Sequence, residues 1–142
     1  MHRHTAAALL AATLLLTGCS NTSDAPSPGA TAQAAGAQVT ATKTTFTPGI
    51  AAVGTDYTTL KVTITNTGTT PIKVNPLYFA IVDTTKAKHA VSIGTVKGEI
   101  ATMELAPGEN TTGTIAAEGT FTPDYVTWTS GYRGPEVRAS VS

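Results

Sequence analysis

The nine residues Thr58–Asn66, TTLKVTITN, decide the fold. Leu60, Val62 and Ile64 alternate with polar side chains, and a period of two is typical of a strand that is buried on one face. The stretch leads into Asn66-Thr67-Gly68, where asparagine and glycine tolerate the left-handed backbone that a chain reversal needs. The pattern therefore predicts a half-buried strand followed by a turn.

Similar short segments follow one another from Gln38 to the end of the chain. Threonine is frequent there, and no stretch repeats apolar residues at helical spacing. Alternation and turn residues predict further strands at 39–46, 77–83, 88–92, 100–105, 110–117, 124–129 and 136–141, and residues 72–74 continue the alternation after Pro71. In the segment 77–83, alternation predicts that Leu77, Phe79 and Ile81 face the core. Short strands at this spacing predict an all-β domain, an antiparallel sandwich of about seven to eight strands with Greek-key connections, over residues 38–142.

Composition limits both the fold and the function. The 142 residues suffice for one domain with appendages, and nine Lys/Arg balance nine Asp/Glu. Balanced charge argues against a nucleic-acid partner, which requires a basic surface. Cys19 is the single cysteine, so the chain forms no internal disulfide and no cysteine-based zinc site. Trp128, on a predicted central strand, is the expected anchor of the core.

The N-terminus has the pattern of an export signal. A short basic segment, MHRH, precedes the uncharged residues Thr5–Leu16, which as a helix would cover only about 18 Å of a ~30 Å hydrocarbon layer. Leu16-Thr17-Gly18-Cys19 then resembles the bacterial lipobox. The resemblance implies that residues 1–18 are a lipoprotein signal peptide, cleaved between Gly18 and Cys19, and that the Cys19 thiol carries a diacylglyceryl group. Two acyl chains suffice for stable anchoring.

Residues 19–37 then comprise the lipidated cysteine and a linker. The linker is rich in Ala, Ser, Thr, Pro and Gly and has no aromatic or branched aliphatic side chain, which predicts disorder and leaves O-glycosylation open. Cleavage removes Arg3, so eight basic residues face nine acidic ones and the formal charge is 8 − 9 = −1. A near-neutral chain has no electrostatic attraction to anionic headgroups, so the lipid is the expected membrane contact.

Three stretches of the domain resemble a known family. They are Leu60–Gly68 (LKVTITNTG), Val74–Asp83 (VNPLYFAIVD) and Leu105–Gly113 (LAPGENTTG). They look like the immunoglobulin-like domain of bacterial lipoproteins that is labelled a domain of unknown function and is related to the telokin-like, immunoprotective extracellular antigen fold. The resemblance implies an immunoglobulin-like sandwich with no assigned catalytic residues and no cofactor. The chain departs from the pattern at Asp83–Lys86, where the expected glycine is missing and a different turn is predicted.

Few side chains offer catalytic or metal-binding chemistry. His89 is the one histidine left after cleavage, and Ser92, three residues on, would face the other side of a strand, so no hydrolytic triad is expected. We expect His89 to face solvent. Blue-copper sites need two histidines and a cysteine, and His89 with Met103 would offer at most an incidental contact, so no metal is expected. Glu104 and Glu109 flank a turn, where solvated charges are common.

The loop Ser130–Pro135, SGYRGP, is the candidate binding loop. Tyr132 and Arg133 stand at its tip, and these two residue types are enriched at binding hot spots. The alternative is that Tyr132 packs on a neighbouring strand. Tyr78 and Tyr125 are predicted to point outward from their strands.

These features favour a non-enzymatic binding or adhesion protein, lipid-anchored at the extracytoplasmic face of the cell membrane. Its ligand would be an unknown protein or a cell-wall component, and proteolysis of the linker could shed part of it to the medium. An accessory subunit that docks on a membrane or cell-envelope complex is the alternative, and an enzyme of the cell envelope is a remote one. The oligomeric state is left open.

Overall fold

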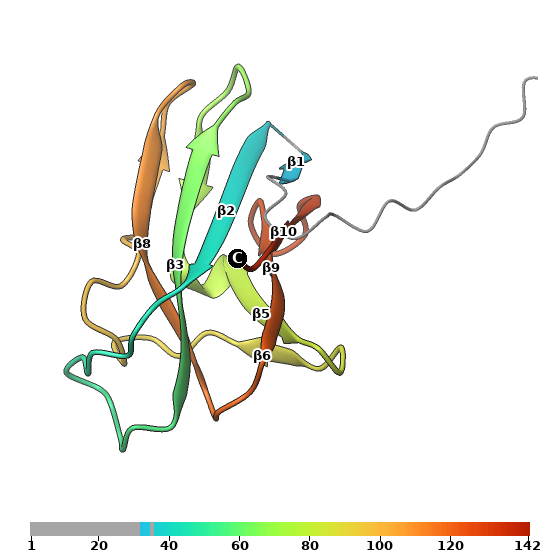
Figure 1. Ribbon diagram of the computed structural model, residues 1–142. Helices are drawn as coiled ribbons and strands as arrows, with labels where there is room; N and C mark the ends of the chain where they lie inside the picture. The colour runs from blue at the N-terminus through green and yellow to red at the C-terminus, as the bar shows by residue number, and fades with distance from the viewer. Residues whose placement is uncertain (1–31, 35) are drawn as a thin grey trace, which may run out of the picture.

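The computed structural model describes residues 32–34 and 36–142, and its elements are strands joined by turns and loops (Figure 1). The strands are β1 (Ala32–Ala34), β2 (Ala37–Lys43), β3 (Tyr57–Asn66), β4 (Ile72–Val74), β5 (Phe79–Asp83), β6 (Lys88–Ala90), β7 (Met103–Leu105), β8 (Asn110–Glu118), β9 (Pro123–Thr129) and β10 (Glu136–Ser140). The 3₁₀ helix η1 (Pro76–Tyr78) precedes β5, and the described residues contain no α-helix. The all-β prediction is confirmed, with more strands than expected.

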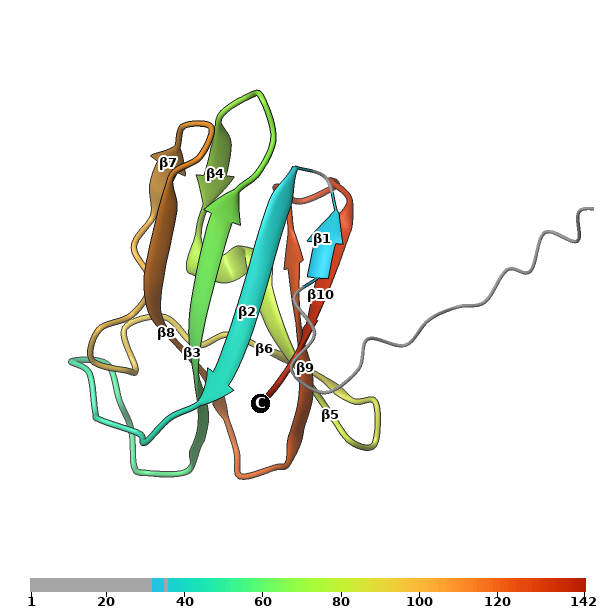
Figure 2. The ribbon, with the colours of Figure 1, turned by 45° about the horizontal axis from the view of Figure 1, so that its top comes forward.

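The strands form two facing sheets and a short pair. One sheet has the order β1-β2-β3-β8, the other has the order β10-β9-β5-β6, and β4 pairs with β7. All of these pairings are antiparallel. Figure 2 shows the first sheet in front, with the β4–β7 pair behind β3 and β8. The arrangement is an immunoglobulin-like β-sandwich, as predicted.

β3 organises the first sheet because it is paired along both edges. Its residues from Leu60 to Asn66 pair with β2, and those from Tyr57 to Thr65 pair with β8. Leu60, Val62 and Ile64 are fully buried, so the predicted alternation is confirmed. Each buried aliphatic side chain contributes about 1.5–3 kcal/mol relative to leaving it in water.

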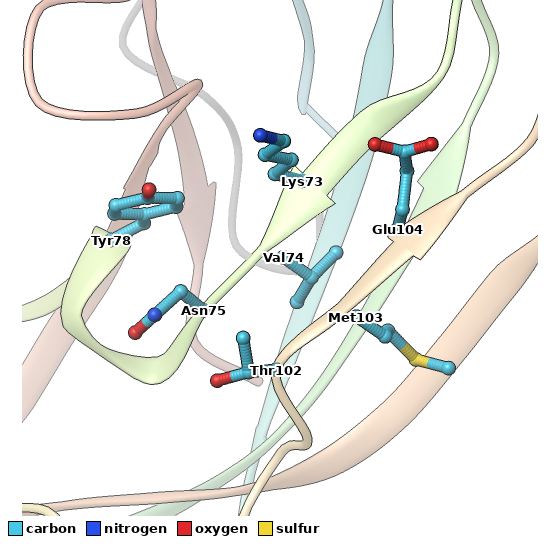
Figure 3. Close-up of a pocket in the computed structure, with 7 residues that line it drawn as sticks. All are labelled: Lys73, Val74, Asn75, Tyr78, Thr102, Met103 and Glu104. Carbon is cyan, nitrogen blue, oxygen red and sulfur yellow. The ribbon is translucent and has the colours of Figure 1, made fainter.

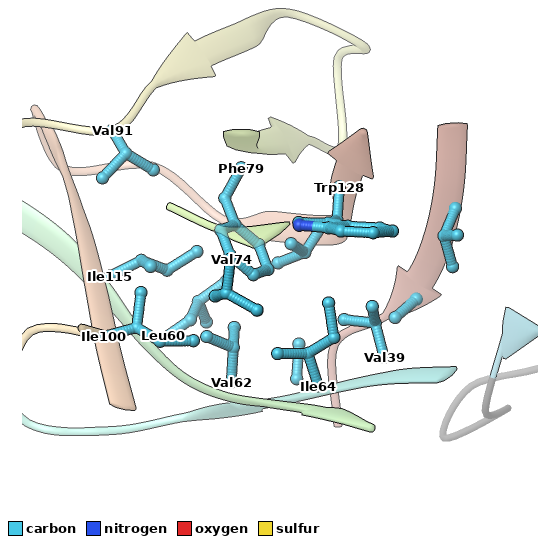
Figure 4. Close-up of a cluster of buried hydrophobic side chains, with 14 of the residues drawn as sticks. Val39, Leu60, Val62, Ile64, Val74, Phe79, Val91, Ile100, Ile115 and Trp128 are labelled. Carbon is cyan, nitrogen blue, oxygen red and sulfur yellow. The ribbon is translucent and has the colours of Figure 1, made fainter. Parts of the chain in front are cut away.

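The core lies between the sheets and centres on Trp128. This side chain of β9 is fully buried, and in the register of the second sheet it lies between Phe79 of β5 and Val137 of β10. Figure 4 shows the Trp128 ring beside Phe79 and above Ile64. Its indole N–H has no hydrogen-bond partner, so Trp128 stabilises the core through its apolar contact area. The predicted anchor is confirmed.

Turn residues set the ends of the strands as the sequence indicates. The Asn66 side chain is fully buried: its Nδ2 donates to the carbonyl oxygens of Thr70 (2.8 Å) and Leu105 (2.9 Å), and its Oδ1 accepts from the amide of Gly68 (3.0 Å). In the turn before β8, Gly108 has φ of 85° and the Glu109 amide donates to the Ala106 carbonyl. These are the features of a type II turn, whose two central positions suit Pro107 and Gly108.

The structure differs from the sequence prediction at Leu77. This side chain was expected to face the core and is 54% exposed. Asn75 caps a 3₁₀ helix by accepting from the Leu77 amide at 2.9 Å, and Pro76 stands in the first turn. Because the helix replaces the first residues of the predicted strand, alternation begins only at Phe79, and the prediction for Leu77 is wrong.

The start of the first sheet and the turn after Asp83 also differ from the sequence prediction. β1 pairs with β2 from Ala32, inside the segment 19–37 that was predicted to be linker, so the sheet begins before Gln38. In the turn after Asp83, Lys86 takes φ of 73°, the left-handed conformation for which glycine was expected. The chain therefore forms a glycine-type turn without glycine, and the prediction of a different turn at Asp83–Lys86 is wrong.

Replacing Trp128 tests the importance of the core anchor. Trp128→Ala leaves a large cavity between the sheets, and we expect the free energy of unfolding to fall by about 3–5 kcal/mol in denaturant titrations. Val53→Ala shortens a side chain that is 86% exposed and should change it by less than about 0.5 kcal/mol. Equal losses for the two variants would contradict the assignment of Trp128 as the anchor.

Candidate functional site

The predicted binding loop is a tight connection between β9 and β10. Gly131 has φ of 80°, and a Cβ on Gly134 would lie 2.2 Å from the Ser130 carbonyl oxygen, so both positions require glycine. The loop leaves Tyr132 84% exposed and Arg133 exposed as well. Both side chains are thus exposed at the loop, and their role in binding stays a prediction.

Tyr132 lies against a second tyrosine that is far from it in the chain. Its ring centroid is 5.6 Å from that of Tyr78, and the ring planes meet edge to face at 83°. Such edge-to-face pairs contribute about 0.5–1.5 kcal/mol beyond the area they bury. Tyr78 is half-buried because η1 packs its ring against the core. Tyr132 therefore packs on a neighbouring element and also remains exposed, which combines the two alternatives that the sequence left open.

A pocket of about 240 Å³ opens beside Tyr78 (Figure 3). Its lining consists of Lys73, Val74, Asn75, Tyr78, Thr102, Met103 and Glu104. Lys73 of β4 and Glu104 of β7 are directly opposite in the strand register, so a cation and an anion flank one side of the pocket. Drug-sized ligands occupy about 300–1,000 Å³, so this pocket suits one side chain or one ring of a larger partner.

Apolar side chains extend this surface. Leu77 is 54% exposed and Met103 41% exposed. The name tyrosine surface is used below for the set Lys73, Leu77, Tyr78, Met103, Glu104 and Tyr132. Aromatic and apolar contact area beside directed polar groups is the composition of a recognition surface. Of this set the sequence indicated only Tyr132, together with Arg133 of the same loop, because the contact with Tyr78 and the pocket depends on η1 and the β4–β7 pair.

His89 has a different environment from the one predicted. Its ring is stacked on Phe121 with centroids 3.7 Å apart and planes within 9°, and its Nε2 lies 2.9 Å from Asp83 Oδ2. The His89 side chain is 27% exposed, so the prediction that it faces solvent is wrong. The ring covers Phe121, and Phe121 was not assigned to a strand.

Asp83 holds the β5–β6 hairpin together. Its Oδ1 accepts from the Thr85 hydroxyl at 2.6 Å, the Thr85 amide at 2.8 Å and the Ala87 amide at 3.0 Å. The hydrogen bond from the Thr85 side chain, followed by that with His89, holds the pKa of the Asp83 carboxyl well below its usual range. Within the described part of the chain, the His89 ring is thus tied to the carboxylate that bonds the β5–β6 turn.

The remaining candidates are separated from one another. Met103 lies on β7 and His89 on β6, in different strand pairs. Glu109 accepts from the Ala106 amide at 2.8 Å, whereas Glu104 borders the pocket. Tyr125 is half-buried, with Lys86 and Arg138 about 5.6 and 5.4 Å from its ring centroid. Residues 32–34 and 36–142 contain no group of three or more His, Cys, Asp or Glu side chains placed to hold a metal ion.

The predicted lipobox, Leu16, Thr17, Gly18 and Cys19, lies outside the described residues. Among those described, no helix is both long enough and apolar enough to cross a bilayer.

Comparison with protein families and curated proteins gives one match. A family described as "Domain of unknown function (DUF4352)" matches residues 27–118. No curated protein matches the chain.

Solved structures show the same fold at low sequence identity. The secreted protein MPT63 of Mycobacterium tuberculosis is 16% identical, with a TM-score of 0.53 over 68% of this chain and 76% of that one. The yjhA protein of Bacillus subtilis is 14% identical, with a TM-score of 0.56 over 81% of this chain and 98% of that one. A Bacillus subtilis protein titled "a putative lipoprotein (ycdA)" is 16% identical, with a TM-score of 0.59 over 79% of this chain and 38% of that one.

The hydrogen bonds of Asp83 make stability depend on pH. A carboxylate whose pKa is lowered by folding stabilises the fold above its ordinary pKa of about 3.8 and loses that contribution as the pH falls toward the folded value. We expect Asp83→Asn to be less stable than the wild type at pH 7 and to lose less stability between about pH 5 and pH 2.

Thermal unfolding monitored by circular dichroism measures this difference. Asp56→Asn, at an exposed position in the β2–β3 loop, is the matched control and should follow the wild-type pH dependence. An Asp83→Asn variant with the wild-type pH dependence would show that the Asp83 carboxylate does not cause the loss of stability at low pH.

Proposed function

The chain belongs to the DUF4352 family, the domain of unknown function whose model matches residues 27–118, and from this premise we propose that it is a lipid-anchored extracytoplasmic binding protein. The observation that carries the proposal is the tyrosine surface: Tyr132 is 84% exposed and stands edge-on to Tyr78 beside a pocket flanked by Lys73 and Glu104. In this proposal the domain recognises its partner through that surface and performs no catalysis.

The extracytoplasmic location and the lipid anchor are proposed from the N-terminal sequence. An uncharged segment too short to span a bilayer precedes Leu16-Thr17-Gly18-Cys19, the order that lipoprotein processing requires. The titles of two structural neighbours, a secreted protein and "a putative lipoprotein", agree with export of this fold. The anchor would be the diacylglyceryl group on Cys19.

The chemistry of the site favours binding over turnover. A hydrolytic site needs a nucleophile, a base and an orienting acid within hydrogen-bond reach of one another. In this domain the imidazole of His89 is occupied by Asp83 and Phe121. The pocket offers an ammonium group, a carboxylate and an aromatic ring, which can recognise a ligand through charge and contact area. A cell-wall polymer is the proposed partner, because one sugar ring or one side chain of such a polymer fits a pocket of about 240 Å³.

Docking on a membrane complex is the second candidate. The exposed side chains of Leu77 and Met103 favour it, because aliphatic contact area beside aromatic rings is common at protein–protein contacts.

Site-specific photo-crosslinking in intact cells tests the proposal. A photoreactive phenylalanine derivative replaces Tyr132 in one full-length variant and Glu118, an exposed residue at the end of β8, in a matched control. We expect position 132 to form adducts with wall polymer that wall-digesting enzymes release, and position 118 to form several-fold fewer.

The outcomes separate the candidates. A single, stoichiometric membrane protein crosslinked at position 132 would favour docking over wall binding. Equal crosslinking at positions 132 and 118 would contradict the assignment of the tyrosine surface to binding.

A further inference from the structure

The connection between β2 and β3 presents an uncharged, apolar surface. Its residues Thr44–Thr55, TTFTPGIAAVGT, include no charged side chain. Ile50 is fully exposed and Val53 is 86% exposed. Ile93, on the segment that faces this loop, is 48% exposed. We name these three residues the apolar tip. Exposed aliphatic side chains scattered singly need no explanation, but three in neighbouring loops at one end of a sandwich form an interaction surface.

The loop is held in a defined shape. The amides of Gly49 and Ala51 donate to the carbonyl oxygens of Thr95 and Gly94, and the Lys97 amide donates to Thr47. Gly49 approaches the facing segment so closely that a Cβ would lie 2.3 Å from the Gly94 carbonyl oxygen. The backbone therefore directs Ile50 away from the domain while the rest of the loop is bonded to it.

Aromatic side chains support the base of the loop. Phe46 and Tyr57 stack with their ring centroids 4.9 Å apart. The Tyr57 hydroxyl lies 3.3 Å from the amide nitrogen of Val53 and accepts its hydrogen. Along the chain, the first charged residues on either side of the loop are Lys43 and Asp56. On the facing segment, the exposed Lys97 lines the same pocket as Ile50.

The apolar tip and the start of β1 face the same end of the sandwich. β1 is antiparallel to β2, with Ala34 opposite Ala37 and Ala32 opposite Val39. Because β2 runs on from Val39 to Lys43, where the loop begins, the chain enters β1 from the side on which the loop lies. Figures 1 and 2 show the loop after β2 at the end of the sheet away from the β1–β2 turn.

The tyrosine surface belongs to the other end. Tyr57, at the base of the apolar loop, pairs with Glu118 at the end of β8, and the chain then turns into the start of β9 at Pro123. The loop that carries Tyr132 follows Thr129, at the opposite end of β9. Seven residues of strand, about 23 Å, thus separate the two ends.

We propose that the apolar tip rests on the lipid bilayer when the chain is anchored, with Ile50 and Val53 at the boundary between headgroups and acyl chains. This inference rests on the anchor at Cys19 in the proposed function. The twelve residues 20–31 between Cys19 and β1 can span at most about 40 Å when fully extended, so the anchor holds the domain within that distance of the membrane. The chain enters β1 from the side of the apolar tip, which favours this end as the one that meets the bilayer.

A lipid bilayer suits the aliphatic side chains of the apolar tip better than a charged partner would. Aliphatic side chains gain free energy on leaving water, and the long side chain of Lys97 beside them lets its ammonium group stay among the headgroups. The sequence indicated that the acyl chains are the membrane contact; the loop adds a second contact, made by the domain itself. The domain would then stand with the tyrosine surface turned away from the bilayer.

Fluorescence quenching in vesicles tests the contact. The mature, lipid-modified full chain is reconstituted in vesicles of phosphatidylcholine and phosphatidylglycerol, with an environment-sensitive fluorophore attached at Ile50→Cys or, as the matched control, at Tyr132→Cys. The sulfur of Cys19 does not react because it is in a thioether. We expect lipids spin-labelled near the headgroup to quench the label at position 50 roughly twofold and to leave the label at position 132 unchanged.

Each other outcome is decisive. If the protein floats with the vesicles and the label at position 50 is not quenched, the bilayer contact is wrong while the anchor stands. If the protein does not float with the vesicles, the anchor of the proposed function fails, and the contact fails with it. A label at Ile93→Cys should lose its quenching when Ile50→Asp and Val53→Asp are introduced, and unchanged quenching would overturn the role of these two side chains.

Discussion

The alternation of side chains along β3 is the constraint on which the rest of the domain depends. A shift of one residue in its register would turn Leu60, Val62 and Ile64 from the core to solvent. Since β3 is bonded to β2 on one edge and to β8 on the other, the same shift would misplace both neighbours. The buried Asn66 side chain closes the strand by bonding the following turn and the end of β7, which fixes where the alternation stops.

The sandwich built around β3 separates two surfaces of different chemistry. One end of the sandwich has an uncharged loop with exposed Ile50 and Val53, and the loop at the far end of β9 brings Tyr132 to Tyr78. In both surfaces the backbone of the loop fixes where the exposed side chains lie. Gly49 and Gly134 permit backbone contacts that a Cβ would block, so the loops are shaped by the same close packing that forms the sheets.

The parts of the structure that follow from local sequence were predictable. Alternation identified β3, the residues Pro107-Gly108 identified a turn, and Trp128 was recognised as the core anchor from its size and strand. Local sequence patterns gave wrong predictions where a helix cap or a residue distant in the chain determines the position of a side chain. Asn75 and Pro76 begin a 3₁₀ helix that turns Leu77 outward, and His89 is covered by Phe121 of another segment. β1 has only alanine and glutamine, which give no pattern that distinguishes a strand from a linker.

The candidate site likewise has a part that the local sequence predicts and a part that depends on distant residues. The sequence indicated Tyr132 and Arg133 because glycine and proline mark an exposed loop. Tyr78, the pocket and the facing charges of Lys73 and Glu104 depend on pairing between β4 and β7, which are far apart in the chain. The apolar tip was missed because Ile50 and Val53 resemble core residues when only the sequence is considered.

Both surfaces have their proposed roles only if the chain is attached to a membrane through one sulfur atom. Metabolic labelling of intact cells with radioactive palmitate, followed by fractionation, measures that attachment directly. The account predicts that the wild-type chain incorporates label and sediments with membranes, and that Cys19→Ser does neither. A Cys19→Ser chain that still incorporates palmitate and remains in the membrane fraction would contradict it.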